Sequence, residues 1–223
     1  MFTIVLIEPE SDGNIGAVSR SMKNFGIKNL ILVNPKAPLT DEVKAYSMHA
    51  YDVYRNAKKE ESIDCLERFD LTIAFTGNVN TGSGIRRTPV PLKALKDILT
   101  AKKIALVFGR ESTGLTNMEL ETCDIISTIP ANPQYPTMNL SHAVTIVLYE
   151  LTKNAGSRSN DKASIATKKR LLNYFNTHVD NGSFKNPDVI KLSFRRIIAR
   201  SGITEKEAKA VLTIFSKLLK KKE

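Results

Sequence analysis

Short apolar runs alternate with segments of helical periodicity along the first 150 residues. Five runs of five or six residues, rich in Val, Ile and Leu, are typical of buried strands: 3–7, 29–33, 71–76, 103–108 and 125–129. The segments between and after them predict helices at 17–26, 40–57, 91–99, 117–121 and 139–152. Because buried strands that alternate with helices form parallel sheets covered on both faces, this pattern predicts an α/β fold with a parallel sheet.

The pattern changes after residue 152. Residues 153–167 are polar and predict a linker. Helical periodicity then returns at 168–178 and 185–222, with no further strand pattern. The sequence therefore predicts a first domain at 1–152, a linker, and a small domain of two to four helices at 168–223.

The loops that follow the predicted strands differ in composition from the rest of the chain. Residues 9–16, 77–84, 109–114 and 130–138 are rich in Gly, Asn, Ser and Pro. Ligands of parallel sheets bind beyond the carboxyl ends of the strands. We therefore expect these four loops to surround the functional site.

The two predicted domains differ in their balance of basic and acidic residues. Residues 151–223 hold 17 Lys and Arg against 6 Asp and Glu, whereas the remaining residues hold 16 against 17. Basic segments are typical of polyanion binding, because each Lys or Arg placed near a phosphate releases condensed counterions. The C-terminal segment is therefore predicted to bind nucleic acid, and a solvated basic helical face is the alternative.

The composition of the chain indicates the cellular compartment in which the protein works. Hydrophobic residues make up 42% of the chain, and no apolar run approaches the roughly 18 residues that cross a bilayer. The apolar run at 2–7 leads directly into Glu8 and Glu10, which argues against a signal peptide. Cys65 and Cys123 lie far apart, so neither a disulfide nor a metal site is expected. These features favour a cytoplasmic protein that does not enter the membrane.

Residues 109–116 (GRESTGLT) follow a predicted strand and hold two glycines five residues apart. A phosphate-binding P-loop needs Lys and then Ser or Thr after the second glycine, and here Leu-Thr follows. The Gly-Ser-Gly at 82–84 continues as Ile-Arg-Arg, so it is not a dinucleotide fingerprint either. Binding of nucleoside triphosphates and dinucleotides is therefore disfavoured, and simple strand-to-helix turns at Gly109 and Gly114 remain an alternative.

Residues 14–20 (NIGAVSR) place Asn14 in a predicted loop and Arg20 on the helix that follows. Such a pair can share a face near the carboxyl end of a strand. The alternative is that Asn14 caps the helix and that Arg20 is a solvated surface charge.

Residues 129–144 (IPANPQYPTMNLSHAV) hold three prolines in seven residues. Proline stiffens a loop and removes backbone donors, so this segment is suited to wrap a ligand through its remaining backbone groups. Asn139 to Ser141 then opens a long apolar helix and is suited to cap it. The alternative is a rigid connector.

Taken together, three segments resemble the SPOUT class of methyltransferases, and in particular its tRNA ribose 2′-O-methyltransferase branch. The resemblance is carried by NIGAVSRSMKNFG at 14–26, FGRESTGLT at 108–116 and IPANPQYPTMNLS at 129–141, and it covers roughly residues 1–152. One departure is Thr137-Met138-Asn139, where the family often has Ser-Leu-Asn. A hydroxyl at this place would come from Thr137.

The resemblance implies a parallel sheet whose C-terminal part is tied in a trefoil knot, an exception to unknotted topology. It also implies a homodimer whose active site is completed across the interface, with S-adenosylmethionine bound in the knot and no metal. The implied cofactor-binding residues are Thr76, Gly77, Asn78, Gly109, Ile129, Pro136, Thr137 and Met138. The implied ribose-facing residues are Asn14 and Arg20, supported by Glu111, Asn139 and Ser141.

The implied activity is methylation of a ribose 2′-hydroxyl in tRNA, at cytidine or uridine 32 of the anticodon loop. The family gives Arg20 the role of base. A guanidinium does not readily release its proton, so we expect Arg20 to clamp the neighbouring phosphate and stabilise the developing alkoxide instead. Two alternatives are a ribosomal RNA 2′-O-methyltransferase and a non-catalytic RNA-binding protein, and the intact Asn14, Arg20 and Asn139 argue against the second.

Overall fold

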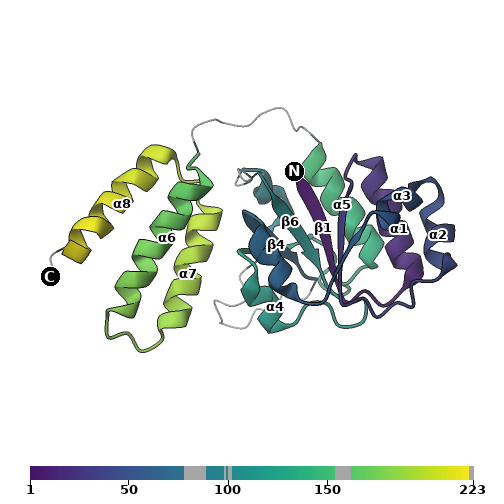
Figure 1. Ribbon diagram of the computed structural model, residues 1–223, viewed down its shortest axis with the longest axis horizontal. Coiled ribbons are helices and arrows are strands. Elements are labelled where there is room, and N and C mark those ends of the chain that lie inside the picture. Colours follow the sequence, from purple (N-terminus) through teal and green to yellow (C-terminus); the bar gives the residue numbers. More distant parts are fainter. Residues whose placement is uncertain (78–88, 98, 100–101, 154–161, 221–223) are drawn as a thin grey trace. The chain divides into compact units, whose positions relative to one another are not determined.

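The computed structural model describes residues 1–77, 89–97, 99, 102–153 and 162–220. The chain divides into two compact units (Figure 1). The N-terminal unit comprises Met1–Lys96 and Lys102–Ala155, and the C-terminal unit comprises Asp97–Ala101 and Gly156–Glu223.

The N-terminal unit is built on a seven-stranded sheet in the order β3-β2-β1-β6-β4-β7-β5, and every pairing is parallel. Its strands are β1 (Phe2–Ile7), β2 (Asn29–Val33), β3 (Lys58–Glu60), β4 (Leu71–Phe75), β5 (Val90–Pro91), β6 (Ile104–Phe108) and β7 (Ile125–Thr128). The parallel α/β fold and its five apolar strands are thus confirmed. The edge strands β3 and β5 were not predicted, because two or three residues without an apolar run carry no strand signal.

Helices cover both faces of this sheet. They are α1 (Asp12–Asn24), α2 (Asp41–Ser47), α3 (Tyr51–Arg55), α4 (Asn117–Thr122) and α5 (Leu140–Thr152), with 3₁₀ turns η1 (Met48–Ala50), η2 (Ile63–Arg68) and η4 (Leu92–Asp97). Residues of α4 and η2 share one core cluster with alternate residues of β1. Helices α1 and α5 lie side by side, and the Ser21 and Thr145 hydroxyls join them at 2.6 Å (Figure 1). The predicted helix at 40–57 is interrupted at Met48, whose φ is +50°.

Helix α1 begins five residues earlier than the sequence pattern predicted. Ser11 is its N-cap, and the Ser11 hydroxyl accepts a hydrogen bond from the Asn14 backbone N–H at 3.3 Å. Asn14 therefore lies in the first turn and is neither a loop residue nor the cap. At 3.6 residues per turn, positions 14 and 20 lie about 120° apart around the axis of α1, so the shared face that was possible for a loop Asn14 does not arise within this helix.

The described part of the C-terminal unit contains three helices, α6 (Ile165–Asp180), α7 (Pro187–Arg200) and α8 (Glu205–Lys220). Leu171, Ile198 and Leu212 form its buried centre, one from each helix. The Phe175 and Phe194 rings stack with their centroids 3.8 Å apart. Helix α6 begins inside the segment predicted as a linker, because Ser164 caps it through the Thr167 backbone N–H.

A search of the described helices finds none long and apolar enough to cross a membrane. Among the same residues there is also no group of His, Cys, Asp or Glu arranged to hold a metal ion.

Candidate active site

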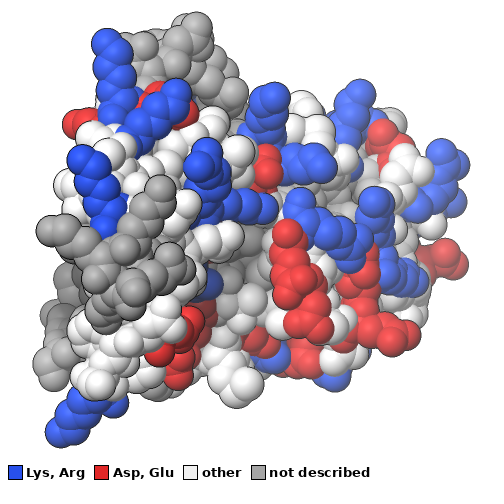
Figure 2. Space-filling view, turned by 60° about the vertical axis from the view of Figure 1, so that its left-hand side comes forward, with Lys and Arg blue, Asp and Glu red and all other residues white. Residues whose placement is uncertain are grey.

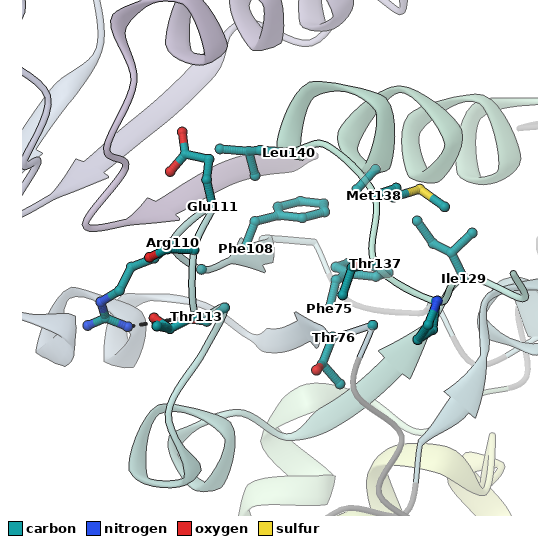
Figure 3. A pocket seen from close by; sticks show the side chains of 16 residues that line it. Phe75, Thr76, Phe108, Arg110, Glu111, Thr113, Ile129, Thr137, Met138 and Leu140 are labelled. Carbon is teal, nitrogen blue, oxygen red and sulfur yellow. Dashed lines mark hydrogen bonds between the residues drawn. The ribbon is translucent and has the colours of Figure 1, made fainter. Parts of the chain in front are cut away.

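A cavity of about 270 Å³ opens beyond the carboxyl ends of β4, β6 and β7, where three loops converge (Figure 3). Seven of the eight residues predicted to bind the cofactor line it: Thr76, Gly77, Gly109, Ile129, Pro136, Thr137 and Met138. The eighth, Asn78, lies outside the described residues. Described residues from three of the four expected loops, Gly77, 109–114 and 136–138, therefore meet at one edge of the sheet, as expected for parallel strands.

Apolar side chains form the wall of this cavity nearest the sheet. The Phe75 and Phe108 rings stack with centroids 4.9 Å apart and an interplanar angle of 11°. Ile129, Met138 and Leu140 also point toward the space in Figure 3. A concave apolar surface of this kind, with backbone polar groups at its rim, suits a small ligand that carries a flat ring.

Two glycines allow the loops to approach one another. A Cβ on Gly109 would lie 2.3 Å from the Gly114 carbonyl carbon, and a Cβ on Gly77 would lie 3.0 Å from the Pro136 carbonyl oxygen. Gly114 itself has φ of +68°, a conformation that L side chains rarely adopt. The cavity therefore depends on glycine at these positions.

A chain of hydrogen bonds connects four of the five predicted ribose-facing residues. The Asn14 side-chain N–H donates to Glu111 Oε1 at 2.9 Å, and the Asn139 side-chain N–H donates to Asn14 Oδ1 at 2.8 Å. Asn139 Oδ1 accepts from the Ser141 backbone N–H at 2.8 Å and from the Ser141 hydroxyl at 2.7 Å. We call these four residues, Asn14, Glu111, Asn139 and Ser141, the asparagine network.

Arg20 stands apart from the asparagine network. Its side chain is exposed on α1, and the structure shows no hydrogen bond or ion pair for it with any described residue. Within one chain, the fold thus assembles the network without the residue expected to act on the ribose.

Glu10 also binds Glu111, and the sequence did not predict Glu10 as a site residue. The Glu10 backbone N–H donates to Glu111 Oε2 at 2.9 Å. The Glu10 carboxylate accepts from the Ser112 backbone N–H at 2.9 Å and from the Ser112 hydroxyl at 2.7 Å. Both oxygens of Glu111 therefore have donors, so this carboxylate is arranged to orient Asn14.

Arg110 was also missed, and it fixes the base of the same loop. Its guanidinium donates to Glu8 at 2.7 Å and binds both oxygens of Glu119, at 2.9 and 3.1 Å. It also donates to the Gly114 carbonyl at 3.1 Å. The hydrogen bond from Arg110 holds the pKa of Glu8 below its usual value. Burial raises the pKa of Glu119, but donors from Arg110 and Thr116 outweigh burial and lower it overall. The only signal in the sequence was the presence of charged residues after two strands, Glu8 and Glu10 in one loop and Arg110 and Glu111 in the other.

Comparison with known proteins gives one family match and many relatives. Residues 1–149 match the SpoU rRNA Methylase family. The chain is 35% identical over 227 residues to the tRNA (cytidine-2′-O-)-methyltransferase TrmJ of Methanocaldococcus jannaschii, covering 96% of this chain and 98% of that protein. It is 39% identical over 156 residues to the tRNA (cytidine/uridine-2′-O-)-methyltransferase TrmJ of Pectobacterium atrosepticum, covering 66% of this chain and 62% of that one. Among solved structures, a probable methylase family protein from Haemophilus influenzae superposes with a TM-score of 0.69 at 27% identity, covering 100% of this chain and 98% of that one.

Proposed function

Since the chain belongs to the SpoU rRNA methylase family, we propose that it transfers a methyl group from S-adenosylmethionine to the ribose 2′-hydroxyl of a cytidine or uridine in tRNA. One observation carries this function: the asparagine network adjoins the cavity lined by the predicted cofactor residues, because Glu111 lines that cavity and Asn139 directly follows Met138. The tRNA substrate is supported by the archaeal TrmJ, which matches over both units of the chain.

The cavity fits S-adenosylmethionine. Its stacked Phe75 and Phe108 rings and the apolar Ile129 side chain suit an adenine ring, and the backbone at 136–138 offers polar groups at the rim. When bound, the cofactor supplies a methyl group activated by a sulfonium. The protein has to exclude water and hold the acceptor oxygen in line with the methyl group, and such alignment contributes roughly 7–11 kcal/mol.

The asparagine network would hold the ribose. A side-chain amide has two N–H donors, and the structure shows one partner for each of the Asn14 and Asn139 amide groups. Among the described residues, the second N–H of each amide has no partner, and it would be available to ribose oxygens. Because Glu111 and Ser141 fix the two amide planes from either end of the network, these donors need little reorganisation during the reaction.

Arg20 would complete the site from a second subunit. We infer a homodimer, because Arg20 is exposed and lies outside the asparagine network of its own chain. A guanidinium stays protonated, so Arg20 would clamp the phosphate beside the target ribose and stabilise the developing alkoxide. The proton would leave to that phosphate or to water.

Three further assignments belong to this proposal. The cavity loops at 109–114 and 129–138 would form the trefoil knot of the SPOUT fold. The C-terminal unit would bind the tRNA backbone without reading its sequence, because residues 151–223, which include its three described helices, hold 17 Lys and Arg against 6 Asp and Glu. In the view of Figure 2, Lys and Arg side chains are exposed together with Asp and Glu side chains. A tRNA substrate would also place the protein in the cytoplasm.

One assay tests the proposal. The protein is incubated with labelled S-adenosylmethionine and either tRNA or ribosomal RNA, and the modified nucleoside is mapped. We expect 2′-O-methylcytidine or 2′-O-methyluridine at position 32 of the tRNA anticodon loop. Methylation of ribosomal RNA alone would replace the substrate, and no incorporation into either RNA would favour a non-catalytic binding protein.

A further inference from the structure

Tyr135 is the most exposed aromatic side chain among those the structure describes, at 76% relative exposure. Its ring makes no ring contact or side-chain hydrogen bond with any described residue. By contrast, Tyr51 and Tyr54 contact each other, and Lys153 covers Tyr149. An aromatic ring that is exposed to water buries little apolar surface in the fold, and its face is available to a binding partner.

The loop that carries Tyr135 is fixed. The Tyr135 backbone N–H donates to the Asn132 carbonyl at 2.9 Å, and the Gln134 backbone N–H donates to the Asn132 side-chain oxygen at 3.0 Å. Pro133 restricts the backbone inside this turn, and Pro136 restricts it directly after the turn. The ring is therefore presented from a rigid support, and a partner would bind it at a small entropic cost.

Tyr135 is also close to the reacting groups. The next three residues, Pro136 to Met138, line the cofactor cavity, and the fourth is Asn139 of the asparagine network. At no more than about 3.6 Å per residue, the Tyr135 Cα lies within roughly 15 Å of the Asn139 Cα. A nucleotide whose ribose contacts the asparagine network has its own base, or the next base along, within reach of this ring.

We propose that Tyr135 stacks on an unpaired nucleobase of the RNA substrate, at or next to the methylated nucleotide, and so holds the target ribose at the asparagine network. This inference rests on the proposed function. Proteins that recognise RNA loops stack splayed-out bases on aromatic side chains, and any base offers such a face. Stacking of this kind needs no base identity, so it is compatible with either cytidine or uridine as the target.

Steady-state kinetics with tRNA test this proposal. Tyr135→Ala should lower kcat/KM by roughly 5- to 100-fold, mainly through a higher KM for tRNA, whereas Tyr135→Phe should stay within about twofold of wild type because the ring remains. The affinity for S-adenosylmethionine, measured by calorimetry, should be the same in all three proteins. Gln134→Ala is the matched control, because it alters the same exposed turn without removing a ring.

Fluorescence would report the stacking on a base directly. The chain contains no tryptophan, so Tyr135→Trp introduces a single tryptophan at this position, whose fluorescence can be excited selectively over that of the tyrosines. Stacking on a base should quench its fluorescence when an anticodon stem-loop RNA is added, and Tyr51→Trp, which lies on α3, should respond little.

The proposal is overturned if Tyr135→Ala keeps the wild-type kcat/KM, or if Tyr135→Phe or Gln134→Ala is as defective as Tyr135→Ala. It is also overturned if the fluorescence of the Tyr135→Trp variant does not change on RNA binding. These results differ from a failure of the proposed function, in which wild-type protein itself would not methylate tRNA.

Discussion

Asn139 has two roles in the structure that one pair of substitutions can separate. Its Oδ1 caps α5 through the Ser141 backbone N–H, and its side-chain N–H holds Asn14. Asn139→Ala removes both functions. Loss of an N-cap costs about 1 kcal/mol and loss of a further hydrogen bond about 1 kcal/mol, so we expect the free energy of unfolding to fall by about 2 kcal/mol. For a chain of this size, that lowers Tm by about 4–8 °C.

Asn139→Asp keeps the capping oxygens and removes the donor to Asn14. We expect its Tm to stay within about 2 °C of wild type, because a carboxylate also favours the helix N-terminus. Its carboxylate would face Asn14 Oδ1, which displaces the amide that Glu111 orients. We therefore expect methyl transfer to fall by at least about 10-fold, since small misplacements of positioning groups cost up to about 100-fold. Thermal unfolding and single-turnover methylation of the three proteins measure both effects. Wild-type turnover by Asn139→Asp would refute the role of this donor, and an unchanged Tm in Asn139→Ala would refute the capping role.

Three further predictions follow from the same contacts. Arg20→Lys should retain only a small part of the methylation rate, and Arg20→Ala should retain less, because only a guanidinium binds a phosphate with two donors. Full activity of the lysine variant in a tRNA methylation assay would exclude this clamp. Because the pKa values of Glu8 and Glu119 are lowered in the folded state, the stability they contribute is present at neutral pH and is lost as pH falls below their usual value of 4.5. Arg110→Met should be less stable at pH 7 and should lose less stability than wild type between about pH 5 and about pH 3 in denaturant titrations; parallel pH curves would contradict this. A fragment of residues 1–155 should keep its affinity for S-adenosylmethionine in calorimetry and lose affinity for tRNA in filter binding, and unchanged tRNA affinity at moderate salt would rule out the basic C-terminal unit as the RNA-binding part.

The sequence predicted the parts of this protein that repeat a local physical pattern. The central strands are buried on both faces, so the sequence of each is a continuous apolar run. These strands are β1, β2, β4, β6 and β7. Parallel strands then require their following loops to meet at one edge, which is why unusual loop compositions were enough to locate the cavity. The start of α1 was missed because its first turn is polar, and because its cap, Ser11, sits among other residues typical of loops.

Only the tertiary structure decided how the site residues meet. Asn14 bonds to Glu111 and to Asn139, which are 97 and 125 residues away along the chain, and no periodicity encodes such pairs. The roles of Glu10 and Arg110 likewise arise from loops that adjoin only after β1 and β6 pair. A hydrogen bond depends on distance and angle between specific atoms, whereas sequence patterns report burial, which is an average over many atoms. The sequence therefore determined the layers of the fold and the edge that carries the site, and the packing of its loops determined which polar atoms act together.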